Sequence, residues 1–164
     1  MARYAIDGRI GVSIEGAETS PKVPVGTIVR GFDDVANAEG EYMYVQFNAA
    51  TTEGQAVYLD LTNKSVLADS AAHANDGGPI GFALQAQAAN SYGFVQIGGK
   101  AKAKAGAVVA GAKVFLTAVP GTVDDAVLAG NQLLCAEFDT ADGTPAAGFA
   151  YVSCSRPNVQ GQIT

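Results

Sequence analysis

The side chains that most often carry out chemistry are scarce in this sequence. His73 is the single histidine, and the alanine-rich residues around it predict a solvent-exposed loop. A catalytic triad needs a nucleophile, a histidine base and an orienting group, and a zinc site needs several ligands at set spacings. No serine lies in a Gly-x-Ser-x-Gly pattern, and neither a Cys-x-x-Cys nor a His-x-x-x-His pair occurs. We therefore predict that the protein is not an enzyme and binds no cofactor or metal.

Two acidic pairs, Asp33-Asp34 and Asp124-Asp125, are the next candidates for chemistry. Adjacent residues in an extended chain point to opposite faces, so neither pair forms a converging acid–base couple. Carboxylates in loops can bind calcium, but neither pair lies in an EF-hand pattern. Charged turns exposed to solvent are the favoured interpretation.

The cysteines and the apolar runs indicate the compartment. Cys135 and Cys154 each lie within an apolar run, which favours two buried free thiols over a disulfide. Free thiols agree with synthesis in a reducing cytoplasm. No apolar run approaches the roughly 18 residues of a membrane-spanning helix, and the first residues do not resemble a secretory signal. We expect no association with a membrane.

Lys100, Lys102 and Lys104 alternate with alanine and form the one unusual charge pattern of the chain. In a strand, this spacing places three ammonium groups on one face. The lysines could protect an edge strand from aggregation, or they could dock on an acidic protein surface. Nucleic acid is a poor partner, because the net charge is −6 and no aromatic residues interleave with the lysines.

Strand signals recur along the chain. Short β-branched segments near glycine predict strands at 26–32, 41–47 and 55–61, and alternation predicts one long hairpin over 80–103. Twenty glycines allow close backbone packing. These features predict an all-β fold, a compact β-barrel or β-sandwich of short Gly/Ala/Val-rich strands with an extended N-terminal arm.

A weak internal repeat supports this fold. Residues 54–60, Gly-Gln-Ala-Val-Tyr-Leu-Asp, recur as Gly-Ala-Lys-Val-Phe-Leu-Thr at 111–117. Each copy is followed by two further apolar segments, which suggests two related β units. The other interpretation is chance, because any β-rich chain repeats such a pattern.

The two ends of the chain differ from its middle. Residues 1–22 are interpreted either as a partly extended arm or as a first strand pair of the domain. Residues 23–154 form the predicted β domain. Residues 155–164 are interpreted as a flexible tail or as a second contact arm.

Strand-and-turn motifs rich in small residues run through the middle of the chain, at 54–59, 78–84, 93–101 and 110–116. Over about residues 23–154 they resemble the small capsid decoration (cement) proteins of tailed bacteriophages. The resemblance implies a β fold without enzymatic activity and an oligomer, with three copies expected, on the outside of an icosahedral head. The family has no invariant ligand set, so it assigns no site residues.

The expected role is therefore that of a structural virion protein, made in the host cytoplasm, that stabilises the head by bridging major capsid subunits. Its expected partners are the major capsid protein and further copies of itself, without nucleic acid or membrane. The candidate capsid contacts are Arg3, Tyr4, Ile6, Arg9, Ile10, Lys100, Lys102 and Lys104.

The alternative role is a head-fibre protein, or a receptor- or carbohydrate-binding module of a virion. Sugar-binding sites commonly use aromatic faces, and the chain has no tryptophan. Four tyrosines could take that place: Tyr42, Tyr44, Tyr58 and Tyr92.

Overall fold

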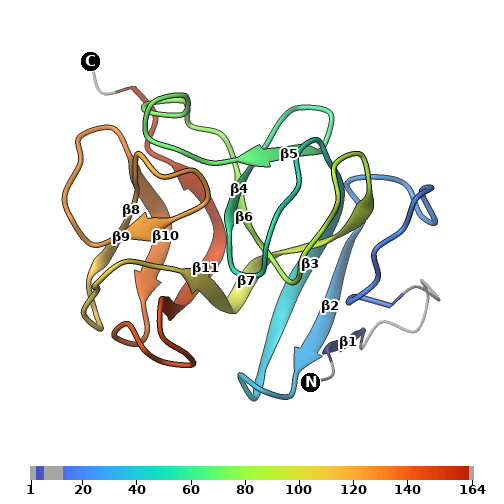
Figure 1. Ribbon diagram of the computed structural model, residues 1–164, viewed down its shortest axis with the longest axis horizontal. Helices are drawn as coiled ribbons and strands as arrows, with labels where there is room; N and C mark the ends of the chain where they lie inside the picture. Colours follow the sequence, from blue (N-terminus) through green and yellow to red (C-terminus); the bar gives the residue numbers. More distant parts are fainter. Residues whose placement is uncertain (1–2, 6–12, 163–164) are drawn as a thin grey trace.

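The computed structural model describes residues 3–5 and 13–162, and all regular structure in these ranges is β-strand (Figure 1). The strands are β1 (Arg3–Ala5), β2 (Ile28–Asp33), β3 (Ala38–Phe47), β4 (Ala56–Leu59), β5 (Lys64–Leu67), β6 (Ile80–Ala83), β7 (Tyr92–Lys104), β8 (Lys113–Leu116), β9 (Val123–Asp124), β10 (Gln132–Phe138) and β11 (Phe149–Val159). The predicted all-β class is confirmed.

The strands form one continuous sheet that closes on itself twice. β3, β5, β4, β6 and β7 form the first ring, because β3 pairs with both β5 and β7. β7, β11, β10, β8 and β9 form the second ring, which closes through a bridge between Ala105 and Val123. β7, with 13 residues, is the longest strand and belongs to both rings. The fold is thus two small barrel-like units joined along one strand.

The order of strand pairing recurs along the chain. In the first unit β4 pairs with β5 and β6, and β6 pairs with β7; β8, β9, β10 and β11 pair in the same way. Gly54 lies shortly before β4 and Gly111 shortly before β8, with φ of 77° and 81°. The Gly54 N–H donates to Ala83 O at 2.8 Å, and the Gly111 N–H donates to Phe138 O at 2.7 Å. Each bond reaches the last residue of the neighbouring strand.

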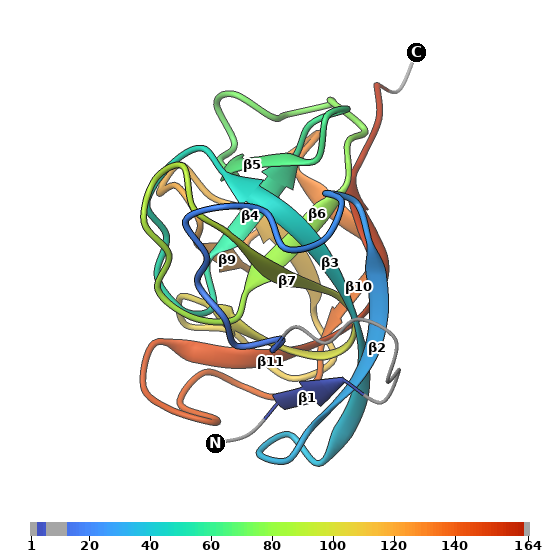
Figure 2. The same cartoon turned by 90° about the vertical axis from the view of Figure 1, so that its right-hand side faces the viewer.

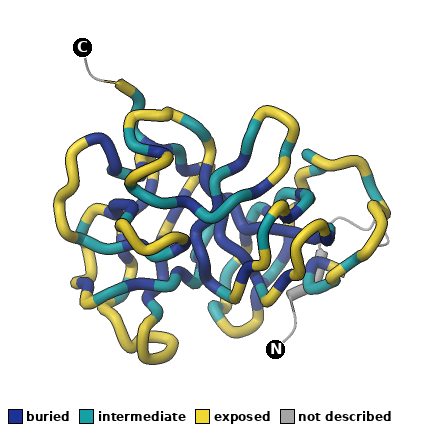
Figure 3. Tube along the Cα trace, turned by 45° about the horizontal axis from the view of Figure 1, so that its top comes forward, coloured by how far each residue is buried: buried dark blue, intermediate teal, exposed yellow. Residues whose placement is uncertain are grey.

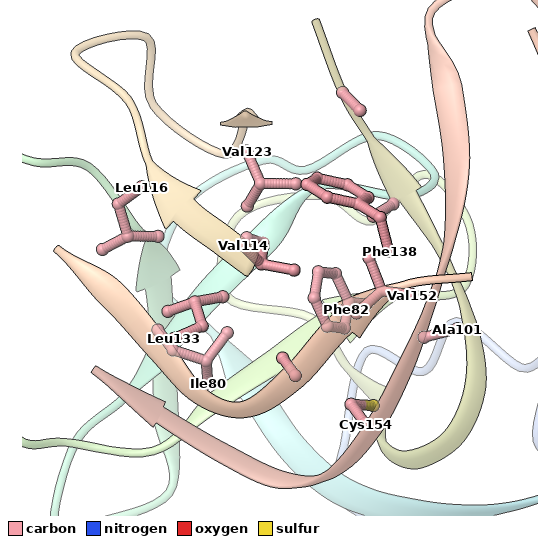
Figure 4. Close-up of a cluster of buried hydrophobic side chains, with 14 of the residues drawn as sticks. Ile80, Phe82, Ala101, Val114, Leu116, Val123, Leu133, Phe138, Val152 and Cys154 are labelled. Atoms are coloured by element: carbon pink, nitrogen blue, oxygen red, sulfur yellow. The ribbon is translucent and has the colours of Figure 1, made fainter. Parts of the chain in front are cut away.

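The core follows the alternation of side chains along the strands (Figure 3). In β4, Val57 and Leu59 are buried inside the first ring, while Ala56 faces a second cluster. Ile80 and Phe82 of β6 join that second cluster, whose large side chains come mainly from β8 to β11 (Figure 4). β4 therefore contributes to both interiors, while β6 directs its large side chains into the second one. Full burial of each large aliphatic side chain contributes about 1.5–3 kcal/mol.

The N-terminal segment lies against the sheet where it is described. Residues 3–5 are extended, as expected for an arm, and pair antiparallel with this chain's own β2 (Figure 2). Ile14 is buried against Tyr44 and Phe94, and Glu18 forms a backbone bridge with Tyr92. Residues 13–22 are therefore attached to the β domain. The predicted contacts Ile6, Arg9 and Ile10 lie outside the described residues.

The hairpin predicted over 80–103 is present, but its first strand is shorter than expected. β6 pairs antiparallel with β7 and ends at Ala83. Residues 84–88 then leave the sheet although their polarity still alternates. This segment keeps one strand-like pairing, because buried Gln87 forms an isolated antiparallel bridge with Thr51.

The interpretation of 155–164 as a tail is wrong for its first half, because β11 continues to Val159. Arginine followed by proline, as at Arg156 and Pro157, is more typical of a loop than of a strand. Arg156 also has a φ of 48°. Both fall where the pairing of β11 with β10 is irregular, so the missing N–H of Pro157 breaks no regular ladder. Gly161 forms a further bridge with Asp76.

The two repeat glycines give a matched test of the fold. We expect Gly111→Ala to lower the free energy of unfolding by about 1–2 kcal/mol, because a left-handed backbone is unfavourable for alanine. Backbone strain is the whole cost here, since the added Cβ would contact nothing within 4 Å. Gly54→Ala should cost about 1–3 kcal/mol more, because its Cβ would lie 2.9 Å from Phe149 Cε1 and 3.0 Å from Lys104 N. Urea unfolding of both variants measures the difference. Equal losses would contradict the tight packing between the two units at Gly54.

Candidate interaction surface

The lysine strip lies on β7, in the middle of the sheet. Its alternation is confirmed, because Ala101 and Ala103 are fully buried while Lys100, Lys102 and Lys104 are half-buried. β11 pairs with this half of β7 along its length. β7 lies between β6 and β11 in the sheet, but among the described residues the ladder along 100–103 joins it to β11 alone, so edge protection stays one interpretation of the strip.

Two lysines of the strip rest on aromatic rings of β11. Lys102 lies opposite Tyr151 in the ladder, yet its ammonium group lies 4.3 Å from the centre of the Phe149 ring. Lys100 lies opposite Ser153, and its ammonium group is 4.7 Å from the centre of the Tyr151 ring. Both contacts are diagonal neighbours on an antiparallel pair, and both are within cation–π distance.

The same two lysines also have acidic partners. Lys100 Nζ is 2.7 Å from Asp139 Oδ2, and Lys102 Nζ is 2.9 Å from Glu53 Oε2. The Lys102 side chain is only 14% exposed. Lys104 forms no ion pair within the part of the chain that the structure describes. The strip therefore offers one uncompensated positive charge to a partner, rather than the three expected from the sequence.

Further ion pairs tie neighbouring strands together beside the strip. Arg156 Nε on β11 is 2.9 Å from Glu41 Oε2 on β3, and the Glu41 carboxylate raises the pKa of Arg156. Arg30 on β2 is 3.6 Å from Glu39 on β3. Arg30, Glu39 and Glu41 line a cavity of 220 Å³, together with residues of β7 and β11 that include Gly99. Both pairs are largely exposed, so solvent screens them and each stabilises the fold only weakly.

His73 is buried, which corrects the prediction of an exposed loop histidine. It is 8% exposed, and its ring stacks on Tyr58 with the ring centres 4.4 Å apart. Its Nδ1 lies 3.2 Å from the Asp69 backbone N–H, which donates to it. Burial and a hydrogen bond to Asp76 raise the pKa of Tyr58. This histidine fastens the loop after β5 to the domain, and nothing in its sequence neighbourhood indicated burial.

The acidic pairs accept backbone hydrogen bonds, within a turn at Asp33 and across to a distant loop at Asp125. Asp33 Oδ1 accepts the backbone N–H groups of Val35 and Ala36 at 2.9 and 3.1 Å, and Asp125 Oδ2 accepts that of Val109 at 3.0 Å. The interpretation as exposed turn charges holds for Asp34, whereas Asp33 is buried at the end of β2 and Asp124 belongs to β9. In the described ranges, no group of three or more His, Cys, Asp or Glu side chains is placed to hold a metal ion.

The tyrosines do not form the platform that the alternative role requires. Tyr42 and Tyr44 are fully buried, and Tyr44 packs edge-on against Phe94 with ring centres 5.0 Å apart. Tyr58 and Tyr92 are half-buried. A sugar-binding face made of all four side chains is excluded.

Comparison with known proteins gives no relative: no protein-family model matches the chain, and no curated protein sequence matches it. Among residues 3–5 and 13–162, no helix has the length and apolar character needed to cross a membrane.

The two cysteines lie in different environments, so the expectation of two buried thiols is wrong for one of them. Cys154 is buried, and burial raises the pKa of its thiol to about 12. Cys135 is exposed, because β10 bulges at this residue and its φ is 59°. Both cysteines are free. No sequence signal distinguishes a bulged residue from its neighbours within an apolar strand.

We expect one thiol per native chain to react rapidly with a chromogenic disulfide reagent at pH 8, and two in denaturant. The Cys154 thiol stays protonated and covered, whereas the Cys135 thiol is open to solvent. The Cys135→Ser variant should show almost no native reaction and one thiol after unfolding. Rapid reaction of both thiols in the native protein would contradict the burial of Cys154.

Proposed function

We propose that this protein is a structural component of a phage virion, which binds the outside of the capsid as an oligomer and bridges major capsid subunits. The observation that carries the proposal is the ordered face over β7, the strand shared by both units. There, Lys100 and Lys102 are held on aromatic rings, and Lys104 presents its charge without an acidic partner among the described residues. The sequence resemblance to decoration proteins supports the same role.

The order of this face favours binding by shape. A lysine held in place loses less conformational freedom on binding than a mobile one. The lysines lie on the half of β7 that pairs with β11, while β3 pairs with residues 92–99 of the same strand. Such a surface can meet an acidic patch of an assembled shell without large rearrangement.

The proposed role needs no chemical step. A protein that binds the assembled shell but not its separated subunits stabilises the shell by mass action. An oligomer strengthens this effect, because its second attachment is intramolecular once the first has formed. β1 ends the order of strands in the sheet, so Arg3 and Tyr4 remain proposed contacts for a capsid segment that adds to this edge.

Heads assembled with and without the chain test the proposal. We expect heads that lack the chain to release DNA at lower temperature, and purified chain added back to restore the wild-type midpoint. Electron microscopy of restored heads should show added density on the outer surface. Equal heat resistance of both kinds of head, with no bound chain on the exterior, would overturn the proposal.

The role of the β7 face can be tested with two lysines of equal charge. We expect Lys104→Gln to weaken binding to chain-free heads about two- to fivefold at low salt, since an exposed charge pair is worth about 0.2–1 kcal/mol. The effect should shrink as salt rises. Lys113→Gln is the control. Lys113 lies away from this face, and its Nζ already forms an ion pair with Glu137 Oε2 at 2.6 Å. Equal binding by Lys104→Gln and wild type would remove Lys104 from the contact surface.

A further inference from the structure

A groove between the N-terminal segment and the first unit contains most of the free positive charge of the described chain. It has a volume of 490 Å³, within the range of roughly 300–1,000 Å³ typical of binding sites. Of the eight basic side chains that the structure describes, five form ion pairs with acids. The other three are Lys22, Lys64 and Lys104, and the first two line this groove. The groove is thus both open and electropositive.

The rest of the groove wall is largely apolar. The apolar residues that line it are Pro21, Val23, Pro24, Val25 and Tyr92. Its wall is fixed by hydrogen bonds: the Thr27 hydroxyl donates to Pro24 O at 2.6 Å, and the Lys22 N–H donates to the Tyr44 hydroxyl at 3.2 Å. The groove is therefore preformed and suits an apolar segment that carries negative charge.

The carboxylate nearest in sequence to Lys64 is that of Asp60, whose pKa is lowered, despite desolvation, by hydrogen bonds from Lys64 and Thr62 and by the nearby Lys64 charge. Asp60 Oδ1 accepts the backbone N–H groups of Thr62 and Lys64 and the Thr62 hydroxyl, at 2.7, 3.0 and 2.8 Å. It forms no ion pair with the Lys64 ammonium group in the described structure. Leu61, next to Asp60 in sequence, is fully exposed.

A segment of matching character lies on the second unit. Residues 126–129, Ala-Val-Leu-Ala, are all exposed, and Val127 is 85% exposed. They follow Asp124 and Asp125, which accept backbone hydrogen bonds but form no ion pair within the described ranges. Four consecutive exposed apolar residues in a loop commonly mark a contact surface.

Other acidic side chains fit the groove less well. Many of them already pair with cations, namely Glu39, Glu41, Glu53, Glu137 and Asp139. Asp142 is exposed but has no large apolar neighbour in sequence. The loop 124–129 combines uncompensated carboxylates with exposed valine and leucine, so it matches both the charge and the apolar wall of the groove.

We propose that the loop 124–129 of one copy docks in the groove of a second copy. The groove-lining residues 21–25 and the loop between β9 and β10 lie at opposite ends of the molecule (Figure 1), so a chain cannot fill its own groove. The contact joins two different surfaces and repeats head to tail, which gives a ring where the rotation closes. This inference deepens the oligomer of the proposed function, although the chain could bind capsids without it.

A mixing experiment tests this contact directly. Lys22→Glu/Lys64→Glu reverses the groove charge, and Val127→Ser/Leu128→Ser removes the apolar part of the loop. These side chains are exposed or line the open groove, and circular dichroism should confirm that both variants fold. Light scattering after size exclusion should give a multiple of 16.6 kDa for wild type and 16.6 kDa for each variant.

The mixture of the two variants is the decisive sample. The groove variant keeps an intact loop, and the loop variant keeps an intact groove, so one junction can form and no second one can follow. We expect a one-to-one complex of twice the single-chain mass. Val119→Ser, at an exposed valine outside the loop, is the control and should retain the wild-type mass.

Three outcomes would overturn the inference: a monomeric wild type, variants that keep the wild-type mass, or a mixture that stays monomeric. If the groove variant keeps the wild-type mass but loses binding to heads, the groove holds an acidic capsid segment instead of a second copy. Capsid binding by a monomeric wild type would overturn this contact while leaving the capsid-binding part of the proposed function intact.

Discussion

The structure depends on the backbone pairing of one strand, β7, which belongs to both closed rings. β7 contributes Val95 and Ile97 to the interior of the first ring and Ala101 and Ala103 to that of the second. All four are odd-numbered residues, so one face of the strand is apolar along its length. The change from large to small side chains lets the aromatic side chains of the second cluster approach the backbone. Gly99, with a φ of 90°, lies at the crossing, where any Cβ would collide with Glu39 O.

The opposite face of the same strand determines what the surface can offer a partner. Even-numbered positions carry the lysines, and β11 supplies the rings beneath two of them. In a chain of net charge −6, most described cations are used to connect strands and loops. Free positive charge is therefore rare, and it remains at Lys104 on the shared strand and at Lys22 and Lys64 in the groove. This distribution separates the proposed capsid contact from the proposed contact between copies.

Much of the fold could be predicted from the sequence because its signals are local. Alternation identified the lysine strand, and the residues of the repeat at 54–60 and 111–117 predicted two related units. The ring closures could not be predicted, because they depend on pairings such as that of β3 with β5 between distant residues. β5 itself follows Asn63, whose φ of 58° and neighbouring polar residues resemble a simple turn.

The candidate site was predicted less completely than the fold. The spacing of the lysines gave their common face, but their carboxylate partners come from distant loops, so the charge that remains free was not predictable. The groove combines residues 21–25 with β3, β5 and Tyr92, and no contiguous motif describes it. His73 and Cys135 show the same limit, since a stacked neighbour and a strand bulge decide their exposure.

The shared-strand arrangement also shows how the last strand of the second unit is held at its end. Each unit ends in a long strand that could begin another, as β7 does. The end of β11 is closed to such growth: Val159 N–H donates to Gly78 O, Asn158 bridges to Pro79, and β10 holds the other side. The segment before β6 thus covers this end of β11, and any further strand that paired there would first have to displace it.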